Sequence, residues 1–539
     1  MAKKPPIWSV YALILLVALG FRLFVAVRLA NDDPDDGRLY AQIARNVLEQ
    51  HVYSAETQAP YTPTLIRLPG YPLFLAAIYA TFGHTNNTAV RVVQAVIDTA
   101  TCVLIALVAF EWAISEERRH RAALFAFALA AVCPFTTIYT ATILTEVCTN
   151  FLAVAMVLAA TFAFKATTRT KALAWWIASG LIAGLAVFFR PDSGLFAAAI
   201  GSTLMLSVVV GNRLAASKFV RLRTAMVSAA LFSLAFCLVL VPWTIRNRRL
   251  FHVFQPLAPA HAEMPGEFVP RGYLLWVRTW LDDERYVGPA LWAMDTRPIH
   301  VEEFPARAFD SKEERDRVAA LFEKYNRGSD EESTDESSDD QSDQDQSSDD
   351  EESQEDEEEP EEPEQPQQPG EVNVEMTPEI DAGFMQIAQE RRARSPFRYY
   401  IALPLKRAKT LWFDTHSEYY PFNGELLPLE DLDHNIHQQY WLPLFAGLTG
   451  LYTLLGVIGG LLLWRSREPD ARRWLLLAAL MMFLRLGFFA TLENPEPRYT
   501  VELFPFLIIL AGAGAAAIKA SATATESESE SGAAVPTAE

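Results

Sequence analysis

Cysteine is scarce in this sequence, with four residues among 539 and no CxxC pair. All four lie in apolar stretches, where a thiol serves as a small buried hydrophobic group. This pattern disfavours a disulfide framework and a cysteine-ligated metal centre. The chain also lacks a convincing internal repeat or strand-rich region, so repeat and β-sheet architectures are not expected.

Positive charge is absent from residues 329–370, which contain 21 Asp and Glu and no large apolar residue. The formal net charge of the chain is −20, so the remainder carries −20 + 21 = +1. The acidic balance therefore says nothing about partners, and no nucleic-acid ligand is indicated. A segment of this composition cannot offset the entropy of ordering, and we predict a disordered tether.

The apolar residues, in contrast, are gathered into runs long enough to cross a bilayer, which requires about 20 residues. We predict an all-α polytopic membrane protein with about ten transmembrane helices. The candidate spans are residues 7–30, 89–112, 122–139, 146–164, 173–189, 194–210, 224–243, 441–464, 474–492 and 499–518.

The basic residues between these spans set the expected orientation, because Lys and Arg are retained on the cytoplasmic side. They cluster in alternate connections, which predicts cytoplasmic N and C termini and an outward-facing first loop over residues 31–87. The first run is too long for a signal peptide and lacks a cleavage site, so it is expected to remain as a span. Residues 70–82 are apolar but too short to span, and an interfacial helix is expected there.

These expectations divide the chain into successive segments. Residues 1–243 form a membrane domain with seven spans, followed by an extracytoplasmic loop over 244–328. The acidic insert covers 329–370, and a second extracytoplasmic loop over 371–440 contains a basic, amphipathic stretch suited to an interfacial helix. Three further spans occupy 441–518, and 519–539 form a disordered cytoplasmic tail.

Four carboxylates crowd the start of the first outward loop, at Asp32, Asp33, Asp35 and Asp36. Crowded carboxylates repel one another, which suits a general base or a metal ligand. Asp36 and Tyr40 are four residues apart, the spacing of about one helical turn, so both are expected near the start of an amphipathic helix. The alternatives are a polar exit turn around the Asp-Pro step and a capping role for Asp35.

A cation follows at Arg67, immediately before the rigid turn Leu-Pro-Gly-Tyr-Pro that includes Tyr71. A guanidinium held at the interface can bind a phosphate with two parallel hydrogen bonds. The alternative is an ordinary interfacial arginine whose head reaches the lipid headgroups.

More polar residues fall at the outward ends of other spans, and their convergence on one face is informative. Asp98 and Arg485 lie within spans, where they are either functional groups or a structural pair between helices. The outward-end residues are Glu146, Arg190, Arg246, Arg498 and Tyr499.

Several short motifs, in this order, resemble the GT-C glycosyltransferases, most closely the bacterial proteins grouped with protein O-mannosyltransferases (family 39) and the lipid A aminoarabinose transferases. The motifs are DDGRLYAQIARNVLEQ, RLPGYPLFLA, ILTE, FFRPDSGLF, PWTIRN and ENPEPRY. The resemblance implies a GT-C type fold with a large first extracytoplasmic loop. It covers residues 7–243 well and the last three spans moderately.

The resemblance also implies roles for single residues. The family's catalytic aspartate corresponds to Asp36, with Asp35 as the alternative, because Gly37 stands where the family often has a second acidic residue. Arg67 corresponds to a basic residue that contacts the donor phosphate. Substrate-binding roles are expected for Arg67, Tyr40, Tyr71, Glu146, Arg190, Arg246, Arg498 and Tyr499.

The expected activity is transfer of a sugar from a polyisoprenyl-phosphate donor to an extracytoplasmic hydroxyl of protein, lipid or glycan, with inversion. Such an enzyme needs a base for the acceptor proton and cations for the departing phosphate. The expected location is the inner (plasma) membrane, in contact with membrane lipid. A divalent cation is left open, and the rival hypotheses are a transporter or lipid flippase and a non-catalytic scaffold.

Overall fold

The computed structural model describes residues 6–29, 34–210, 218–335, 374, 376–414, 434–466 and 468–517. These residues form helices and connecting turns, with no β-strand among them. The chain divides into two compact units. The first comprises residues 1–267, 408–489 and 496–539, and the second comprises residues 268–407 and 490–495.

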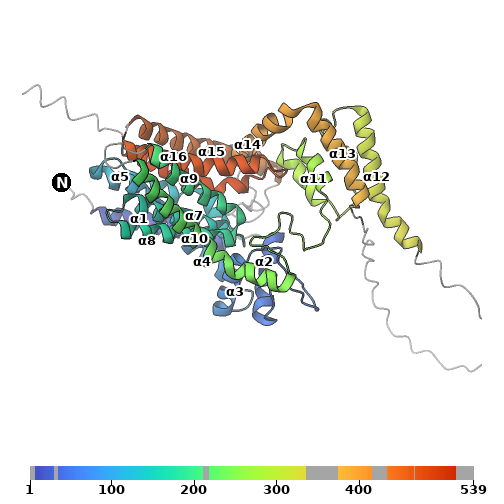
Figure 1. The fold of residues 1–539 in the computed structure, drawn as a ribbon, viewed down its shortest axis with the longest axis horizontal. Coiled ribbons are helices and arrows are strands. Elements are labelled where there is room, and N and C mark those ends of the chain that lie inside the picture. The colour runs from blue at the N-terminus through green and yellow to red at the C-terminus, as the bar shows by residue number, and fades with distance from the viewer. Residues whose placement is uncertain are drawn as a thin grey trace, which may run out of the picture. The chain divides into compact units, whose positions relative to one another are not determined.

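The first unit is a bundle of long apolar helices, drawn together in Figure 1. Two shorter helices, α2 (Asp35–Glu49) and α3 (Gly70–Phe82), lie in the first connection. The other helices are α1 (Ile7–Arg28), α4 (Asn87–Trp112), α5 (Arg119–Ala131), α6 (Pro134–Thr137), α7 (Glu146–Lys165), α8 (Arg169–Phe189), α9 (Gly194–Val210), α10 (Lys218–Phe251), α15 (His434–Arg465), α16 (Pro469–Ala490) and α17 (Phe504–Ala515).

Eight helical segments in the described ranges are long and apolar enough to cross a membrane, and the bent pair formed by α5 and α6 would make nine. The pair bends by 54° at its break. The predicted span over residues 194–210 corresponds to α9, which has 17 residues and falls just short of the usual length. These helices identify a multi-pass membrane protein and confirm the predicted all-α polytopic class.

Close packing of α8 against α10 follows from two glycines one helical turn apart. A Cβ atom at Gly180 would lie 2.3 Å from the carbonyl oxygen of Phe232, and one at Gly184 would lie 2.7 Å from that of Phe236. Small residues at this spacing let two backbones approach within a membrane, where van der Waals contact drives helix association.

A buried ion pair joins α1 to α4. The Arg22 Nε atom lies 2.6 Å from Asp98 Oδ2, and both side chains are buried. Arg22 also donates to the carbonyl oxygens of Ala130 and Ala131 at the end of α5. Asp98 is thus a structural partner between spans, one of the two alternatives that its sequence position allowed.

The second unit has an aromatic core built from both sides of the acidic tract. Its elements include α11 (Arg271–Arg278), α12 (Lys312–Asp335), α13 (Pro378–Arg394), the π-helical turn η8 (Arg398–Ala402) and the start of α14 (Leu403–Phe413). The ring of Phe384 on α13 contacts those of Trp276 and Phe322, with a centroid distance of 5.2 Å in each pair. The segments predicted as two loops therefore fold as one unit, and α12 continues to Asp335 within the predicted tether.

Candidate active site

The position of Asp36 follows from the local structure of α2. The helix starts directly after Pro34, and its first turn carries two acidic residues that interact favourably with the helix dipole. Asn46 holds the connection after the helix, since its side-chain amide donates to the carbonyl oxygens of Ser54 and Glu56 at 2.9 and 2.8 Å. The predicted interfacial helices of the first loop correspond to α2 and α3.

Two contacts fix the turn that carries Arg67. The hydroxyl of Tyr53 donates to the carbonyl oxygens of both Arg67 and Leu68, each at 3.1 Å. Gly70 starts α3 against the end of α8, because a Cβ atom there would lie 2.6 Å from the carbonyl of Phe188. The guanidinium of Arg67 is therefore presented from a tightly held turn.

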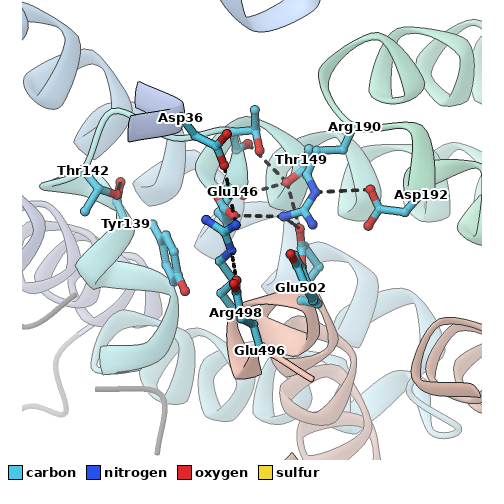
Figure 2. Close-up of polar contacts among 12 residues, drawn as sticks. Asp36, Tyr139, Thr142, Glu146, Thr149, Arg190, Asp192, Glu496, Arg498 and Glu502 are labelled. Carbon is cyan, nitrogen blue, oxygen red and sulfur yellow. Dashed lines mark hydrogen bonds and ion pairs between the residues drawn. The ribbon is translucent and has the colours of Figure 1, made fainter. Parts of the chain in front are cut away.

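Asp36 lies between two guanidinium groups. Its Oδ1 accepts a hydrogen bond from Arg67 Nη2 at 2.9 Å, and its Oδ2 lies 3.5 Å from Arg498 Nη2. Figure 2 shows the Asp36 side chain pointing to Arg498, which in turn pairs with Glu496. The Asp36 side chain is 32% exposed, so the carboxylate is reachable while it is paired.

A second constellation lies beside the first and is centred on Arg190. Its Nη1 lies 2.9 Å from Glu146 Oε1 and 3.2 Å from Glu502 Oε1, and its Nε lies 3.2 Å from Asp192 Oδ1. Arg485 joins the same carboxylates at 2.5 Å from Asp192 Oδ2 and 2.9 Å from Glu502 Oε2. Three carboxylates and two guanidinium groups thus form one network. Figure 2 shows the part of it around Arg190.

The pKa values in the connection between α8 and α9 follow from these neighbours. Burial lowers the pKa of Arg190, but Asp192, Glu502 and Glu146 outweigh it and raise that pKa well above its ordinary value. Burial also raises the pKa of Asp192, but Arg190 and Arg485 bring it below its ordinary value. Both side chains are therefore charged throughout the physiological range.

Tyrosine rings line the region. Tyr40 lies edge-on to Tyr71 with centroids 5.3 Å apart, and burial together with the charge of Asp36 raises the pKa of Tyr40 to about 12. The Tyr71 hydroxyl donates to Gln94 Oε1 at 2.7 Å. The Tyr499 ring lies 5.5 Å from the Arg190 guanidinium and 5.3 Å from that of Arg498, and it links the two constellations.

The structure brings together most of the predicted residues but gives two of them different surroundings. Arg246 lies 4.5 Å from the centroid of the Trp243 ring and donates to the Thr64 carbonyl at 2.8 Å, so it supports the loop that carries Arg67. The Asp35 side chain is 98% exposed and lies 3.5 Å from Arg38 on the outer side of α2. Asp32 and Asp33 lie outside the described residues.

Gly37 explains the departure from the family's acidic pair. A Cβ atom at this position would lie 2.7 Å from the carbonyl oxygen of Ile143, in the segment just before α7. This approach brings α2 against the segment that carries Glu146. A second carboxylate at position 37 would not fit the same backbone.

Sequence reasoning missed Glu502 and Thr149. Thr149 donates to Glu502 Oε1 at 3.2 Å, and the Glu502 side chain is fully buried. The available signal was a carboxylate at the start of the last apolar run, where an ionisable residue needs a partner. Glu493, in the predicted ENPEPRY motif, pairs instead with Arg278 in the second unit.

The paired state of the carboxylates bears on the open metal requirement. In the described part of the chain, no group of three or more His, Cys, Asp or Glu side chains is arranged to hold a metal ion. Asp36 and Glu146 each face a guanidinium group instead, an arrangement of salt bridges and not of metal ligands. No step below uses a divalent cation.

Residues 63–243 match the family described as dolichyl-phosphate-mannose-protein mannosyltransferase. This match confirms the resemblance to GT-C glycosyltransferases over that segment. The segment contains Arg67, Glu146 and Arg190, whereas Asp36 and Arg498 lie outside it.

Solved structures that resemble the chain include the apo oligosaccharyltransferase of Archaeoglobus fulgidus, with 13% identity, a TM-score of 0.47 and coverage of 94% of this chain and 50% of that one. The oligosaccharyltransferase AglB from the same organism, in complex with an inhibitory peptide and a dolichol-phosphate, has 12% identity and a TM-score of 0.47. That match covers 93% of this chain and 50% of AglB. ArnT from Cupriavidus metallidurans, bound to undecaprenyl phosphate, has 14% identity and a TM-score of 0.37. That match covers 94% of this chain and 77% of ArnT. The chain spans about half the length of these oligosaccharyltransferases. No curated protein matches it.

Proposed function

We propose that this protein is a membrane glycosyltransferase that moves a sugar from a polyisoprenyl-phosphate donor to an acceptor hydroxyl on the extracytoplasmic face of the inner (plasma) membrane. One observation carries the proposal: the Asp36 carboxylate lies between the guanidinium groups of Arg67 and Arg498. The family match over residues 63–243 supports a donor of the dolichyl-phosphate sugar type.

Arg67 and Arg498 bind the donor phosphate. A guanidinium group presents parallel N–H donors that match two phosphate oxygens. Negative charge grows on these oxygens as the sugar leaves, and donors already in place stabilise it without reorganising. The side chains of Arg67 and Arg498 are 24% and 12% exposed, so both work in a partly desolvated site where charge interactions are stronger.

Asp36 accepts the proton of the acceptor hydroxyl. As the acceptor oxygen bonds to the anomeric carbon, the bond from that carbon to the phosphate oxygen breaks, and its electron pair stays on the polyisoprenyl phosphate. The attack comes from the face opposite the phosphate, so the configuration inverts. Because Asp36 is paired with Arg67 and Arg498 before the donor binds, the donor phosphate competes for the same guanidinium groups. This exchange releases the Asp36 carboxylate to accept the proton of the acceptor hydroxyl.

The Arg190 constellation orients the sugar. Glu146 has one oxygen bound to Arg190, while its buried Oε2 atom has no hydrogen-bond partner among the described residues. That oxygen is free to accept a hydrogen bond from a sugar hydroxyl. Tyr40, whose phenol stays protonated at neutral pH, supplies a donor near Asp36, and the Tyr499 ring supplies an apolar face. Tyr71 is fully buried and supports Tyr40 from behind.

The acceptor supplies a hydroxyl group. The family description favours a mannosyl donor and a protein hydroxyl. The residues of the site also suit a lipid or glycan hydroxyl, since the base needs only an O–H group within hydrogen-bond reach.

A reconstituted assay tests the proposal. The full chain is placed in sealed vesicles with radiolabelled polyisoprenyl-phosphate mannose and a mixture of peptide, lipid and glycan acceptors. We expect label to move to an acceptor, with release of polyisoprenyl phosphate. Movement of intact donor across the bilayer without consumption would contradict the proposal and favour a lipid flippase.

A further inference from the structure

We propose that the second unit binds the headgroup of an anionic phospholipid in a recess separate from the Asp36 site. The recess has a volume of about 350 Å³ and is lined by the cations Arg307, Arg398 and Lys406, by the carboxylate of Asp282 and by Trp280. All of these residues belong to the second unit, and none takes part in the glycosyl transfer described above.

The recess carries more positive charge than its own carboxylate neutralises. Asp282 is shared between Arg307, at 2.8 Å, and Lys406, at 3.5 Å. Arg398 forms an ion pair with Asp310 at 2.7 Å, and two further arginines also contact Asp310. Arg307 also lies 3.6 Å from Asp283, which is paired with Arg285. These two carboxylates cannot neutralise the three cations, so a positive charge is left for a ligand.

A count over the connected ion pairs gives the same sign. The cations Arg307, Arg391, Arg394, Arg398 and Lys406 share the carboxylates Asp282, Asp310 and Glu314, which leaves an excess of 5 − 3 = +2. Including Asp283 and its partner Arg285 adds one charge of each sign and leaves the excess unchanged. The cluster therefore favours an anion.

The cations of the recess are accessible. The side chains of Arg307, Arg398 and Lys406 are 37%, 39% and 64% exposed. The guanidinium groups can donate to phosphate oxygens while they keep their present partners, because each has five N–H donors.

An exposed apolar strip runs along the same segment as the recess. Phe397, Tyr400, Ile401 and Leu405 are between 47% and 72% exposed, at positions on η8 and the start of α14 or next to them. The recess residues of this segment, Arg398 and Lys406, lie one position away from Phe397 and Leu405. Cations and exposed apolar side chains thus follow one helical segment together.

The other face of the segment is fixed to its unit. Arg407 is buried and its Nε donates to the carbonyl oxygen of Leu281 at 2.6 Å, while its neighbour Leu403 is also buried. The strip is therefore a fixed surface and does not belong to the core. In a multi-pass membrane protein, a basic segment with an exposed apolar strip suits the headgroup region of a bilayer.

The two features together select a lipid over a soluble anion. A phosphate in the recess would be held by Arg307, Arg398 and Lys406, and the acyl chains of the same molecule would lie along Phe397, Ile401 and Leu405. An anionic phospholipid has both parts, whereas a soluble phosphate would leave the strip uncovered.

The test compares lipid binding by the full chain in nanodiscs of mixed phosphatidylglycerol and phosphatidylcholine. Native mass spectrometry counts the molecules of each lipid that stay bound after the protein is released from the nanodisc. The double variant Arg398→Gln/Lys406→Gln removes two recess cations. The matched control Arg315→Gln/Lys324→Gln also removes one arginine and one lysine from exposed ion pairs of the same unit, which lie outside the recess.

We expect wild type and control to retain phosphatidylglycerol in preference to phosphatidylcholine. In the recess variant the ratio of retained phosphatidylglycerol to phosphatidylcholine should fall about tenfold. Hydrogen exchange over residues 396–407 should also be slower in phosphatidylglycerol nanodiscs, for wild type but not for the recess variant. Equal retention by recess variant and wild type, or an equal loss in the control, would overturn the site. Protection of the segment by glycerol 3-phosphate alone would overturn the lipid assignment in favour of a soluble anion.

Discussion

Asp36 accepts a hydrogen bond from Arg67 at 2.9 Å, although 31 positions separate the two residues in the chain. The proposed base and the proposed phosphate ligand therefore hold each other while the donor is absent. The pairing holds the two side chains against each other. It also means that donor binding must exchange one anion for another at Arg67.

This exchange predicts a paradoxical gain in affinity. Asp36→Asn removes the negative charge that competes for Arg67 and Arg498, so undecaprenyl phosphate without a sugar should bind several-fold more tightly. Binding is measured on the purified protein in detergent. Asp35→Asn serves as the matched control, because that side chain lies on the outer side of α2, and it should bind as wild type does. A higher Kd for Asp36→Asn than for wild type would contradict the exchange of Asp36 for phosphate at Arg67.

Replacement of Arg67 should separate charge from geometry. Arg67→Ala removes a cation from the growing phosphate charge, and we expect kcat/KM for the donor to fall about 10²-fold. Arg67→Lys keeps the charge but loses the planar pair of donors, so it should recover only part of the loss. Initial rates over a range of donor concentrations give both values. Equal activity in the alanine variant and wild type would exclude a role at the phosphate.

Gly37 offers a test of how closely α2 must approach the segment before α7. An exposed helical glycine usually gains about 0.5–1 kcal/mol when replaced by alanine. Gly37→Ala should instead lower stability and transfer, because its Cβ atom would lie 2.7 Å from the Ile143 carbonyl. Gly201→Ala, whose Cβ atom would meet nothing within 4 Å, is the control and should be neutral or stabilising. Thermal unfolding of both variants decides, and a stabilised Gly37→Ala protein would refute the contact.

The Asp192 pair predicts a pH dependence of stability. The pKa of Asp192 is lower in the folded protein than in the unfolded chain, so its contribution is complete above the unfolded pKa of about 3.9 and is lost as the pH falls through the folded value. Asp192→Asn should cost about 3–5 kcal/mol at pH 7, because Arg190 and Arg485 lose a buried partner. The variant should also lose less stability than wild type on acidification below about pH 4.

Thermal unfolding from pH 3 to 7 checks this expectation. The control is Asp470→Asn, which breaks an exposed pair with Arg473 and should cost less than about 1 kcal/mol. Parallel acid profiles for Asp192→Asn and wild type would show that Asp192 does not contribute in this way.

The sequence predicted the residues whose signals are local. Helical period placed Asp36 and Tyr40 on one short helix, and the two-proline turn placed Arg67 at its edge. Pairing between spans was beyond prediction, because it depends on which helices become neighbours. Asp98 pairs with Arg22 and Arg485 pairs with Asp192 and Glu502, so neither intramembrane charge has a partner that sequence distance could indicate.

The second unit could not be predicted from the sequence for a related reason. Its aromatic core joins Trp276 and Phe322 from before the acidic tract to Phe384 from after it. Each side alone has too few apolar residues to predict a core. Their association is a long-range contact across a segment with no folding signal of its own.

The most direct test of the central claim is the rate of sugar transfer by Asp36→Asn, measured in vesicles at saturating donor and at the same protein level as wild type. The account predicts a loss of about 10²-fold or more, the usual effect of removing a general base. Asp35→Asn should keep near wild-type transfer. Undiminished transfer by Asp36→Asn, with its fold intact, would contradict the account.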